Sequence, residues 1–278
     1  MNQAYSSGPE IDRGAAAALM NALTDLVVQA GIAILAVNRQ VMKIEGKADG
    51  SPVTEADLAA DRIIAEGLAR LVPEVPTLSE ECVDLATRSS YRGSFFLIDP
   101  LDGTKEYTAG RAEFTVNLAL VTHGMPLLGI IGAPALGLIW RGLVGQGAER
   151  LTIQGSSIGA AAPIHTRRIP QAGSPWVAAV SRSHGDARTE AFIDNRPGAV
   201  RQELGSAVKF GRVAEGEVDI YPRLAPTSEW DIAAGHAVVT AAGGKVTDAH
   251  GADVHFGTGR KDFIVPEFIA WGDPAAAS

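Results

Sequence analysis

The sequence places two carboxylates at the end of an apolar strand, in the string FFLIDPLDGT of residues 95–104. Pro100 has a fixed φ and biases Asp99 toward an extended conformation, so the chain should turn sharply there. That turn can aim the carboxylates of Asp99 and Asp102 and the carbonyl of Leu101 at one point. Oxygen ligands of this kind suit Mg²⁺, which fills its remaining positions with water and substrate phosphate. The string therefore predicts a metal site at a strand end.

A phosphate site is predicted beside this metal. Gly103 and Thr104 follow the second carboxylate directly. Glycine lets an anion approach backbone N–H groups at a tight turn or a helix start. An Asp-Gly pair alone is more typical of an ordinary turn. The whole string after an apolar run favours the metal and phosphate interpretation.

Further carboxylates occur where other elements should begin or end. Asp49 and Asp57 lie in a turn-rich stretch, Glu80 follows a short apolar run, and Asp231 begins a predicted helix. Each has an ordinary alternative, such as a surface charge or a helix cap. Gathered without cations, each like-charged pair would cost about 4 kcal/mol at ~4 Å and an effective dielectric constant near 20. Their convergence would therefore require divalent cations.

Composition and charge fit a globular enzyme. The 278 residues are 46% hydrophobic and 20% charged, which allows one large domain or two that pack closely together. The net charge of −8 argues against binding a nucleic acid polymer, which depends on clustered basic residues. An acidic protein can still bind a phosphate through metal ions that lie between its carboxylates and the substrate.

The sequence also favours a cytoplasmic protein. A single cysteine, Cys82, excludes an internal disulfide and fits a reducing compartment. The first residues lack the basic start and apolar stretch of a secretion signal. The apolar run from Leu127 to Trp140 is short and interrupted by Pro134, so no transmembrane segment is expected.

The chain divides into two predicted halves behind a flexible tail of residues 1–12. Residues 13–155 read as an N-terminal α+β half that binds metal, with helices over 13–38 and 55–71 and an antiparallel meander over 114–151. Residues 156–274 read as a C-terminal α/β half that binds substrate, because strands alternate with helices there.

Several motifs together resemble the inositol monophosphatase and fructose-1,6-bisphosphatase superfamily of Mg²⁺-dependent, lithium-sensitive phosphatases. The match rests on three signatures, which are Glu80-Glu81, the string from Asp99 to Thr104, and Trp230-Asp231. Within the superfamily the chain is most similar to bacterial CysQ-type 3'(2'),5'-bisphosphate nucleotidases, through stretches that include residues 105–107, 113–117, 181–184, 221–223 and 233–237. The resemblance implies a layered α-β-α-β-α sandwich.

The resemblance also implies a ligand set for two or three Mg²⁺ ions. Glu80, Asp99 and the Leu101 carbonyl would bind one ion, and Asp99, Asp102 and Asp231 a second. A third, weaker ion would lie near Glu80 and either Asp49 or Asp57. The implied catalytic residues are Glu80, Thr104 and Asp49, with the Thr104 hydroxyl bonded to Asp49 and helping to orient the attacking water.

The implied substrate is 3'-phosphoadenosine 5'-phosphate, with its 5'-phosphosulfate analogue as an alternative, in sulfur assimilation. Backbone N–H groups of Gly103 and Thr104 would hold the phosphoryl group, and the residues implied to contact the nucleotide are His184, Ser206, Lys209, Arg223 and Asp231. Similar proteins often have two serines where Ser206-Ala207 stands here, so one nucleotide hydrogen bond is expected to be absent or replaced by water.

Two other functions stay open. The same machinery would serve an inositol monophosphatase or another sugar phosphatase, although Lys209 and Arg223 have little use with a monophosphate. A non-catalytic nucleotide-binding regulator is a more distant alternative. The sequence also leaves open a monomer or a homodimer, and peripheral contact with the cytoplasmic face of the inner membrane.

Overall fold

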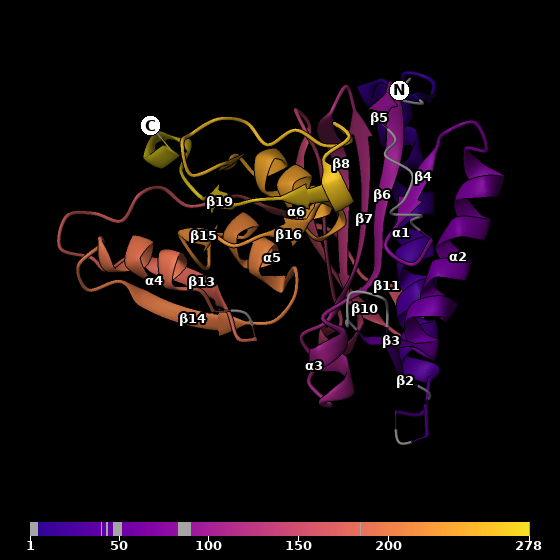
Figure 1. Cartoon of the computed structure of the whole chain (residues 1–278), viewed down its shortest axis with the longest axis horizontal. Coiled ribbons are helices and arrows are strands. Elements are labelled where there is room, and N and C mark those ends of the chain that lie inside the picture. Colours follow the sequence, from indigo (N-terminus) through magenta and orange to yellow (C-terminus); the bar gives the residue numbers. More distant parts are fainter. Residues whose placement is uncertain are drawn as a thin grey trace.

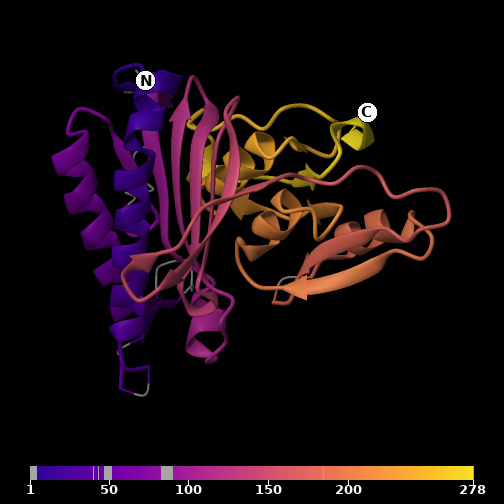
Figure 2. The ribbon, with the colours of Figure 1, turned by 180° about the vertical axis from the view of Figure 1, so that it is seen from behind.

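Two β-sheets and three layers of helices build the chain (Figures 1 and 2). The computed structural model describes residues 5–39, 41–42, 44–46, 52–82, 90–183 and 185–277. Helices α1 (Arg13–Ala36) and α2 (Glu55–Leu71) cover the outer face of the larger sheet. Helices α5 (Val208–Ala214) and α6 (Glu229–Ala241) lie between the sheets, and α4 (Ala187–Asp194) packs on the smaller one. The predicted α-β-α-β-α sandwich is confirmed.

The larger sheet has eight strands and holds the predicted metal-binding string. Its order is β11 (Ser157–Ile158), β10 (Gly147–Gln154), β9 (Leu138–Leu143), β8 (Met125–Ala133), β7 (Thr115–Thr122), β6 (Ser94–Asp102) and β4 (Thr77–Ser79), with β12 (Ala162–Ile164) also paired to β10. The predicted meander is therefore confirmed, and β4 adds a parallel strand beside β6.

The smaller sheet has five strands and the expected parallel pairs. Its order is β14 (Val200–Leu204), β13 (Val177–Ser181), β15 (Ile220–Arg223), β19 (Phe268–Trp271) and β17 (Lys245–Thr247). Strand β19, which the sequence did not predict, pairs antiparallel with both neighbours. The remaining elements are helix α3 (Thr104–Thr108), the strand pairs β1 (Tyr5–Ser7) with β5 (Ser90–Arg92), β2 (Ile44–Gly46) with β3 (Pro52–Thr54) and β16 (Thr227–Ser228) with β18 (Ile264–Val265), and 3₁₀ turns at Pro134–Leu136, Lys261–Phe263 and Pro274–Ala277.

The two outer helices begin where their caps predict. The Asp12 carboxylate accepts a hydrogen bond from the backbone N–H of Ala15 at 2.8 Å and caps α1. At the start of α2, Thr54 and Asp57 form a capping box. The Thr54 hydroxyl accepts a hydrogen bond from the backbone N–H of Asp57, and the Asp57 carboxylate accepts one from the backbone N–H of Thr54. The capping box fixes Asp57 at the base of α2, on the side that faces the strand ends.

Helix α1 is long and apolar enough to cross a membrane by length and composition alone. Its apolar face is instead buried against α2 and the larger sheet through residues such as Leu23, Val27 and Ile34. The core helix of a globular protein meets the same criteria, so this helix is weak support for a membrane span. Sequence inspection had singled out only the run of residues 127–140, which forms β8, a 3₁₀ turn and β9.

Part of the segment predicted as a flexible tail pairs its backbone with the rest of the chain, from Tyr5 onward. Strand β1 pairs in parallel with β5. The backbone N–H of Ile11 donates to Ser94 Oγ at 2.8 Å, and the Ile11 side chain is buried. Backbone pairing, which sequence composition does not reveal, holds this segment against β6.

One hydrophobic cluster joins the two predicted halves, while each half also has a cluster of its own. The larger sheet extends through Ile164, beyond the expected boundary at residue 155. Helix α6, from the C-terminal half, packs on β7, β8 and β9 of the N-terminal half. A Cβ at Gly129 would lie 2.2 Å from the Ala234 carbonyl oxygen, so glycine permits this close approach. The contact brings the start of α6 next to the end of β6.

His236 in α6 should make stability depend on pH. Its ring is buried, neither ring nitrogen has a hydrogen-bond partner among the described residues, and burial lowers its pKa from 6.5 to about 4. The neutral form is therefore favoured in the folded state. Stability from this group is complete above the unfolded pKa and is lost as the pH falls from 6.5 toward 4.

We expect the free energy of unfolding to fall by about 2 kcal/mol between pH 7 and pH 5 because of His236. The His236→Leu variant should lose correspondingly less over that interval. Chemical denaturation of both proteins at the two pH values measures the difference. Parallel losses in the two proteins would show that another group controls the dependence.

Candidate active site

The end of β6 presents Asp99 and Asp102 at a break in sheet register. Asp99 pairs with Asn117 and Asp102 with Thr115, and a bulge separates the two pairs. The backbone N–H of Leu101 donates to Asp99 Oδ1 at 3.1 Å, which holds the bend around Pro100. The Asp99 side chain is buried. Strand β6 continues through Pro100 to Asp102, so the chain bends at a bulge inside the strand, and the prediction that the strand ends in a sharp turn at Pro100 is wrong.

Glu80 reaches the same place from the end of β4. Its backbone N–H donates to the Ile98 carbonyl at 3.1 Å, which extends the parallel pairing by one residue. The buried carboxylate of Asp61, on α2, accepts hydrogen bonds from the Ser79 hydroxyl and the exposed thiol of Cys82. Asp61 thereby anchors both ends of the turn that carries Glu80.

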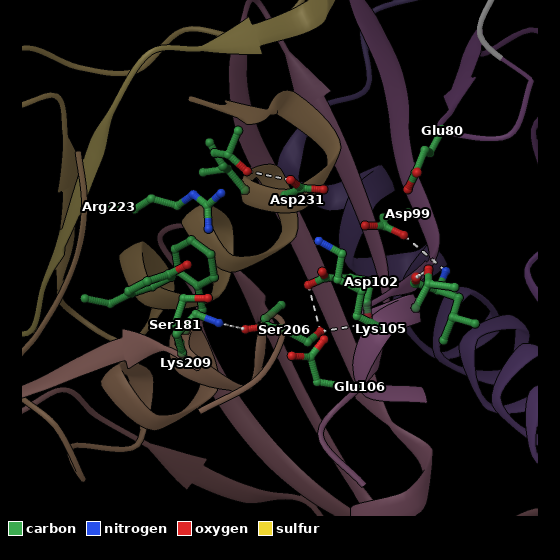
Figure 3. Close-up of a pocket in the computed structure, with 18 of the residues that line it drawn as sticks. Glu80, Asp99, Asp102, Lys105, Glu106, Ser181, Ser206, Lys209, Arg223 and Asp231 are labelled. Carbon is green, nitrogen blue, oxygen red and sulfur yellow. Dashed lines mark hydrogen bonds between the residues drawn. The ribbon is translucent and has the colours of Figure 1, made fainter. Parts of the chain in front are cut away.

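Asp231 arrives from the first turn of α6. The helix begins at Glu229, so Asp231 is its third residue rather than its first. Its Oδ2 accepts hydrogen bonds from the Thr227 hydroxyl at 2.5 Å and the Ser228 backbone N–H at 3.2 Å. These bonds complete a capping box and leave the carboxylate directed toward the end of β6 (Figure 3).

Three of these carboxylates converge closely enough to bind a common cation. Oxygens of Glu80, Asp99 and Asp231 all lie within 4.8 Å of one another. Burial, and then Glu80, Asp102 and Asp231, raise the pKa of Asp99 well above its usual value. Burial is also the main cause of the raised pKa of Asp102 and of Asp231. Such crowding opposes ionisation unless a cation neutralises it.

The donor set fits Mg²⁺, because every converging side chain offers a hard oxygen. Asp102 lies beside Asp99 and its charge contributes to the raised pKa of that residue (Figure 3). Neither Asp102 nor Asp57 is among the three carboxylates that meet within 4.8 Å. Asp57 Oδ2 accepts hydrogen bonds from the backbone N–H and hydroxyl of Thr54, so one oxygen serves the capping box.

The Thr104 hydroxyl bonds to Asp57. It lies 3.3 Å from Asp57 Oδ1 and 3.2 Å from the Leu101 carbonyl oxygen, and it can donate to either. The predicted partner, Asp49, lies outside the described residues. Asp57 is buried, comes from the capping box of α2 and is fixed in place before any ligand binds. The structure thus gives Thr104 a carboxylate partner, Asp57, that the family resemblance implied as a possible ligand of a third ion.

A cavity of about 240 Å³ extends from the carboxylates toward the smaller sheet. Its lining combines Glu80, Asp99, Asp102 and Asp231 with the predicted substrate residues Gly103, Thr104, Ser206, Lys209 and Arg223. Figure 3 shows Arg223 pointing into this space from β15, across from the acidic cluster. His184, another predicted nucleotide contact, lies outside the described residues.

Lys209 and Arg223, the two cations of this cavity that were predicted to contact substrate, have different surroundings. Lys209 is buried, donates to the carbonyl oxygens of Ser206 at 2.6 Å and Leu204 at 3.4 Å, and lies 5.1 Å from the centre of the Tyr221 ring. Burial lowers its pKa to about 8. The Nε of Arg223 is buried and has no hydrogen-bond partner in the described part of the chain. Arg223 is therefore the better placed of the two to receive an anion.

Some residues of this cavity were not predicted to contact substrate. They are Lys105, Glu106, Ser181, Ala207, Phe210, Tyr221, Thr227, Ile232 and Phe268. Lys105 and Glu106 directly follow the metal-binding string, so the sequence alone could have placed them next to the site. Thr227 and Phe268 reach the cavity only because β15 pairs with β19 and β16 precedes α6, which no local pattern reveals.

Known proteins resemble this chain over nearly its full length. The inositol monophosphatase family pattern matches residues 16–277. A protein of Escherichia coli strain K12 named 3'(2'),5'-bisphosphate nucleotidase CysQ is 38% identical over 252 residues, which cover 90% of this chain and 98% of that protein.

Solved structures agree. The crystal structure of CysQ from Bacteroides thetaiotaomicron matches with a TM-score of 0.75 and 32% identity over 91% of this chain and 97% of the other. An IMPase of Thermotoga maritima matches with a TM-score of 0.73 and 25% identity, covering 94% of each chain. Mg²⁺ dependence is general for the family, in keeping with the acidic cluster. The chain belongs to the inositol monophosphatase family.

Proposed function

We propose that this protein is a Mg²⁺-dependent 3'(2'),5'-bisphosphate nucleotidase that removes the 3'-phosphate of 3'-phosphoadenosine 5'-phosphate, with the 5'-phosphosulfate as an alternative substrate. The observation that carries this proposal is a cavity with four carboxylates at one end and the buried, unpartnered Nε of Arg223 at the other. A substrate with two phosphates satisfies both ends. The relatives named as CysQ nucleotidases support it.

Glu80, Asp99, Asp102, Asp231 and the Leu101 carbonyl are the proposed ligands of two Mg²⁺ ions, and Asp99 would serve both. When bound, Mg²⁺ makes a coordinated water more acidic and stabilises charge on phosphoryl oxygens. A third ion would need Asp57 or Asp49 as a further ligand. Asp57 already receives bonds from Thr54 and Thr104, so its larger contribution is to hold Thr104.

Thr104 and Gly103 would position the reacting groups. The Thr104 hydroxyl, held by Asp57 and Leu101, would take a proton from the attacking water as it passes its own proton to Asp57, so that Asp57 is the net proton acceptor. Gly103 adopts φ +88°, where a Cβ would also lie 3.2 Å from that of Ser206. Only glycine fits there without strain, and the turn leaves the first N–H groups of α3 for phosphoryl oxygens.

Lys209 has a smaller proposed role than Arg223. Two of its three N–H groups donate to backbone carbonyls. Its charge still favours a phosphate nearby, but its main contacts hold the turn around Ser206.

The proposed cellular role is in sulfur assimilation, in the cytoplasm.

The test compares substrates and an arginine variant. Wild-type protein at saturating Mg²⁺ should prefer 3'-phosphoadenosine 5'-phosphate to inositol 1-phosphate by kcat/KM. A charge-assisted hydrogen bond is worth roughly 1.5 to 3 kcal/mol, so Arg223→Ala should lower kcat/KM for the bisphosphate by about 10- to 150-fold. Activity on inositol 1-phosphate should barely change, because that substrate has no second phosphate.

Arg188→Ala is the matched control for this test. Arg188 lies near β15, where it donates to the Leu224 carbonyl and pairs with Glu267, and it does not line the cavity. Its removal should leave the substrate preference intact. Equal losses on both substrates in Arg223→Ala would make Arg223 structural. A wild-type preference for inositol 1-phosphate would overturn the nucleotidase assignment in favour of a sugar phosphatase.

A further inference from the structure

The hydroxyl of Ser206, a residue predicted to contact the nucleotide, points at Asp102, a proposed metal ligand. Ser206 Oγ lies 2.7 Å from Asp102 Oδ2 and 3.1 Å from the Asp102 carbonyl oxygen. It also lies 2.5 Å from the hydroxyl of Thr115, a buried residue at the start of β7. Figure 3 shows Ser206 between Lys209 and Asp102. The hydroxyl is therefore engaged by the protein.

Counting protons gives these bonds a direction. An ionised Asp102, the form that binds a cation, can only accept, so the single proton of Ser206 lies toward Asp102 Oδ2. The hydroxyl of Thr115 must then donate to Ser206, and it shares its proton with Asn117 Oδ1 at 2.9 Å. Asn117 Nδ2 makes a long second contact with Asp102 Oδ2 at 3.4 Å.

These donors contact one oxygen of Asp102. Ser206 and Asn117 both reach Oδ2. A carboxylate held by one oxygen has its second oxygen fixed in direction. This is the arrangement in which outer hydrogen bonds orient a metal ligand.

The backbone of Ser206 is held in an unfavourable conformation to make this contact. Its φ is +53°, a region that residues with a Cβ seldom adopt. Lys209 donates to the Ser206 carbonyl oxygen, and the Gly205 N–H donates to Glu113 Oε2 at 2.9 Å. Glycine would adopt this φ with less strain, so the hydrogen bonds of the Ser206 side chain offset a backbone cost.

We infer that Thr115 and Ser206, together the hydroxyl pair, position Asp102 for Mg²⁺ and so set the affinity of the metal site. This inference rests on the proposed Mg²⁺ site and is independent of which phosphate ester the protein hydrolyses. Ser206 is then a positioning residue for the metal, and the nucleotide is recognised by other groups in the cavity.

Titration of the full-length protein with Mg²⁺ by calorimetry, without substrate, tests the inference. Ser206→Gly relieves the backbone strain and removes the hydroxyl, so it should fold well while binding Mg²⁺ about tenfold more weakly. The rise in melting temperature on adding Mg²⁺ should shrink accordingly. Unchanged Mg²⁺ affinity with a raised nucleotide KM would assign Ser206 to nucleotide binding and overturn the inference.

Substitutions of Thr115 provide a second, independent comparison. Thr115→Val keeps the shape of the side chain but loses the hydroxyl, and Mg²⁺ affinity should fall roughly two- to tenfold. Thr115→Ser keeps the hydroxyl and should restore most of that affinity. Equal Mg²⁺ affinities in the valine and serine variants would contradict the inference.

Strand β7 also offers a matched control at its other end. The Thr122 hydroxyl lies 2.9 Å from Ser94 Oγ, a second Thr–Ser pair between the ends of β6 and β7 that lie away from the acidic cluster. Thr122→Val should leave Mg²⁺ affinity unchanged. A loss equal to that of Thr115→Val would mean that strand packing, rather than the hydroxyl pair, controls the metal site. Failure of the substrate test would leave these metal titrations unaffected.

Discussion

Asp99→Asn should lower kcat/KM on the order of 10³-fold and weaken Mg²⁺ binding. Loss of an outer hydrogen-bond partner of a metal ligand typically costs about 10- to 100-fold, and a direct ligand shared by two ions should cost more. Asparagine has the same shape but lacks the negative charge. Calorimetric titration with Mg²⁺ and steady-state kinetics measure the two losses.

The same variant should be at least as stable as wild type when metal is absent. Burial and the charges of Glu80, Asp102 and Asp231 raise the pKa of Asp99, so its ionised form destabilises the metal-free fold near neutral pH. Thermal melts in EDTA should therefore show an equal or higher melting temperature for Asp99→Asn. Unchanged Mg²⁺ affinity would remove Asp99 from the metal site, and a large drop in melting temperature would indicate a structural role.

Thr104→Val should lower kcat by about 10²-fold or more while leaving Mg²⁺ affinity and KM nearly unchanged. A group that orients or deprotonates the nucleophile acts mainly in the transition state, and general acid–base groups typically contribute about 10²- to 10⁴-fold. Valine preserves the shape and removes only the hydroxyl that bonds Asp57 and Leu101. Rapid single-turnover measurements separate the chemical step from product release.

Thr108→Val is the control for this prediction, because it removes an exposed threonine hydroxyl from the same helix. Thr108 donates to the Lys105 carbonyl and does not line the cavity. Its substitution should leave kcat within about twofold of wild type. A raised KM with normal kcat in Thr104→Val would instead make Thr104 a substrate-binding group.

Local chemistry was enough to predict much of this protein. The string of residues 95–104 predicted that Asp99 and Asp102 lie together at the end of a strand, although they flank a bulge within β6 rather than a turn. Helix α2 runs from Glu55 to Leu71 as predicted, because its cap and its periodicity are both local signals. The short signatures pointed to the right family, whose pattern matches residues 16–277.

Boundaries within long apolar stretches were harder to predict. The stretch after Lys261 was predicted to hold one strand, and it holds the short β18 and then β19. Buried strands on both sides of a proline show no alternation of polar and apolar residues, so periodicity cannot separate them. The pairing of Tyr5–Ser7 with β5 likewise depends on backbone groups, which sequence patterns do not report.

The sequence by itself determined which chemistry this protein carries, whereas only the tertiary structure decided which residues work together. Thr104 and Asp57 are 47 residues apart, and Ser206 and Asp102 are 104 apart. The family resemblance implied a metal for Asp57 and a nucleotide for Ser206. The hydrogen bonds that these two side chains make within the protein follow from the packing of α2 and of the β14–α5 turn against the end of β6. A hydrogen bond depends on distances of about 3 Å, which long-range packing sets and local sequence does not.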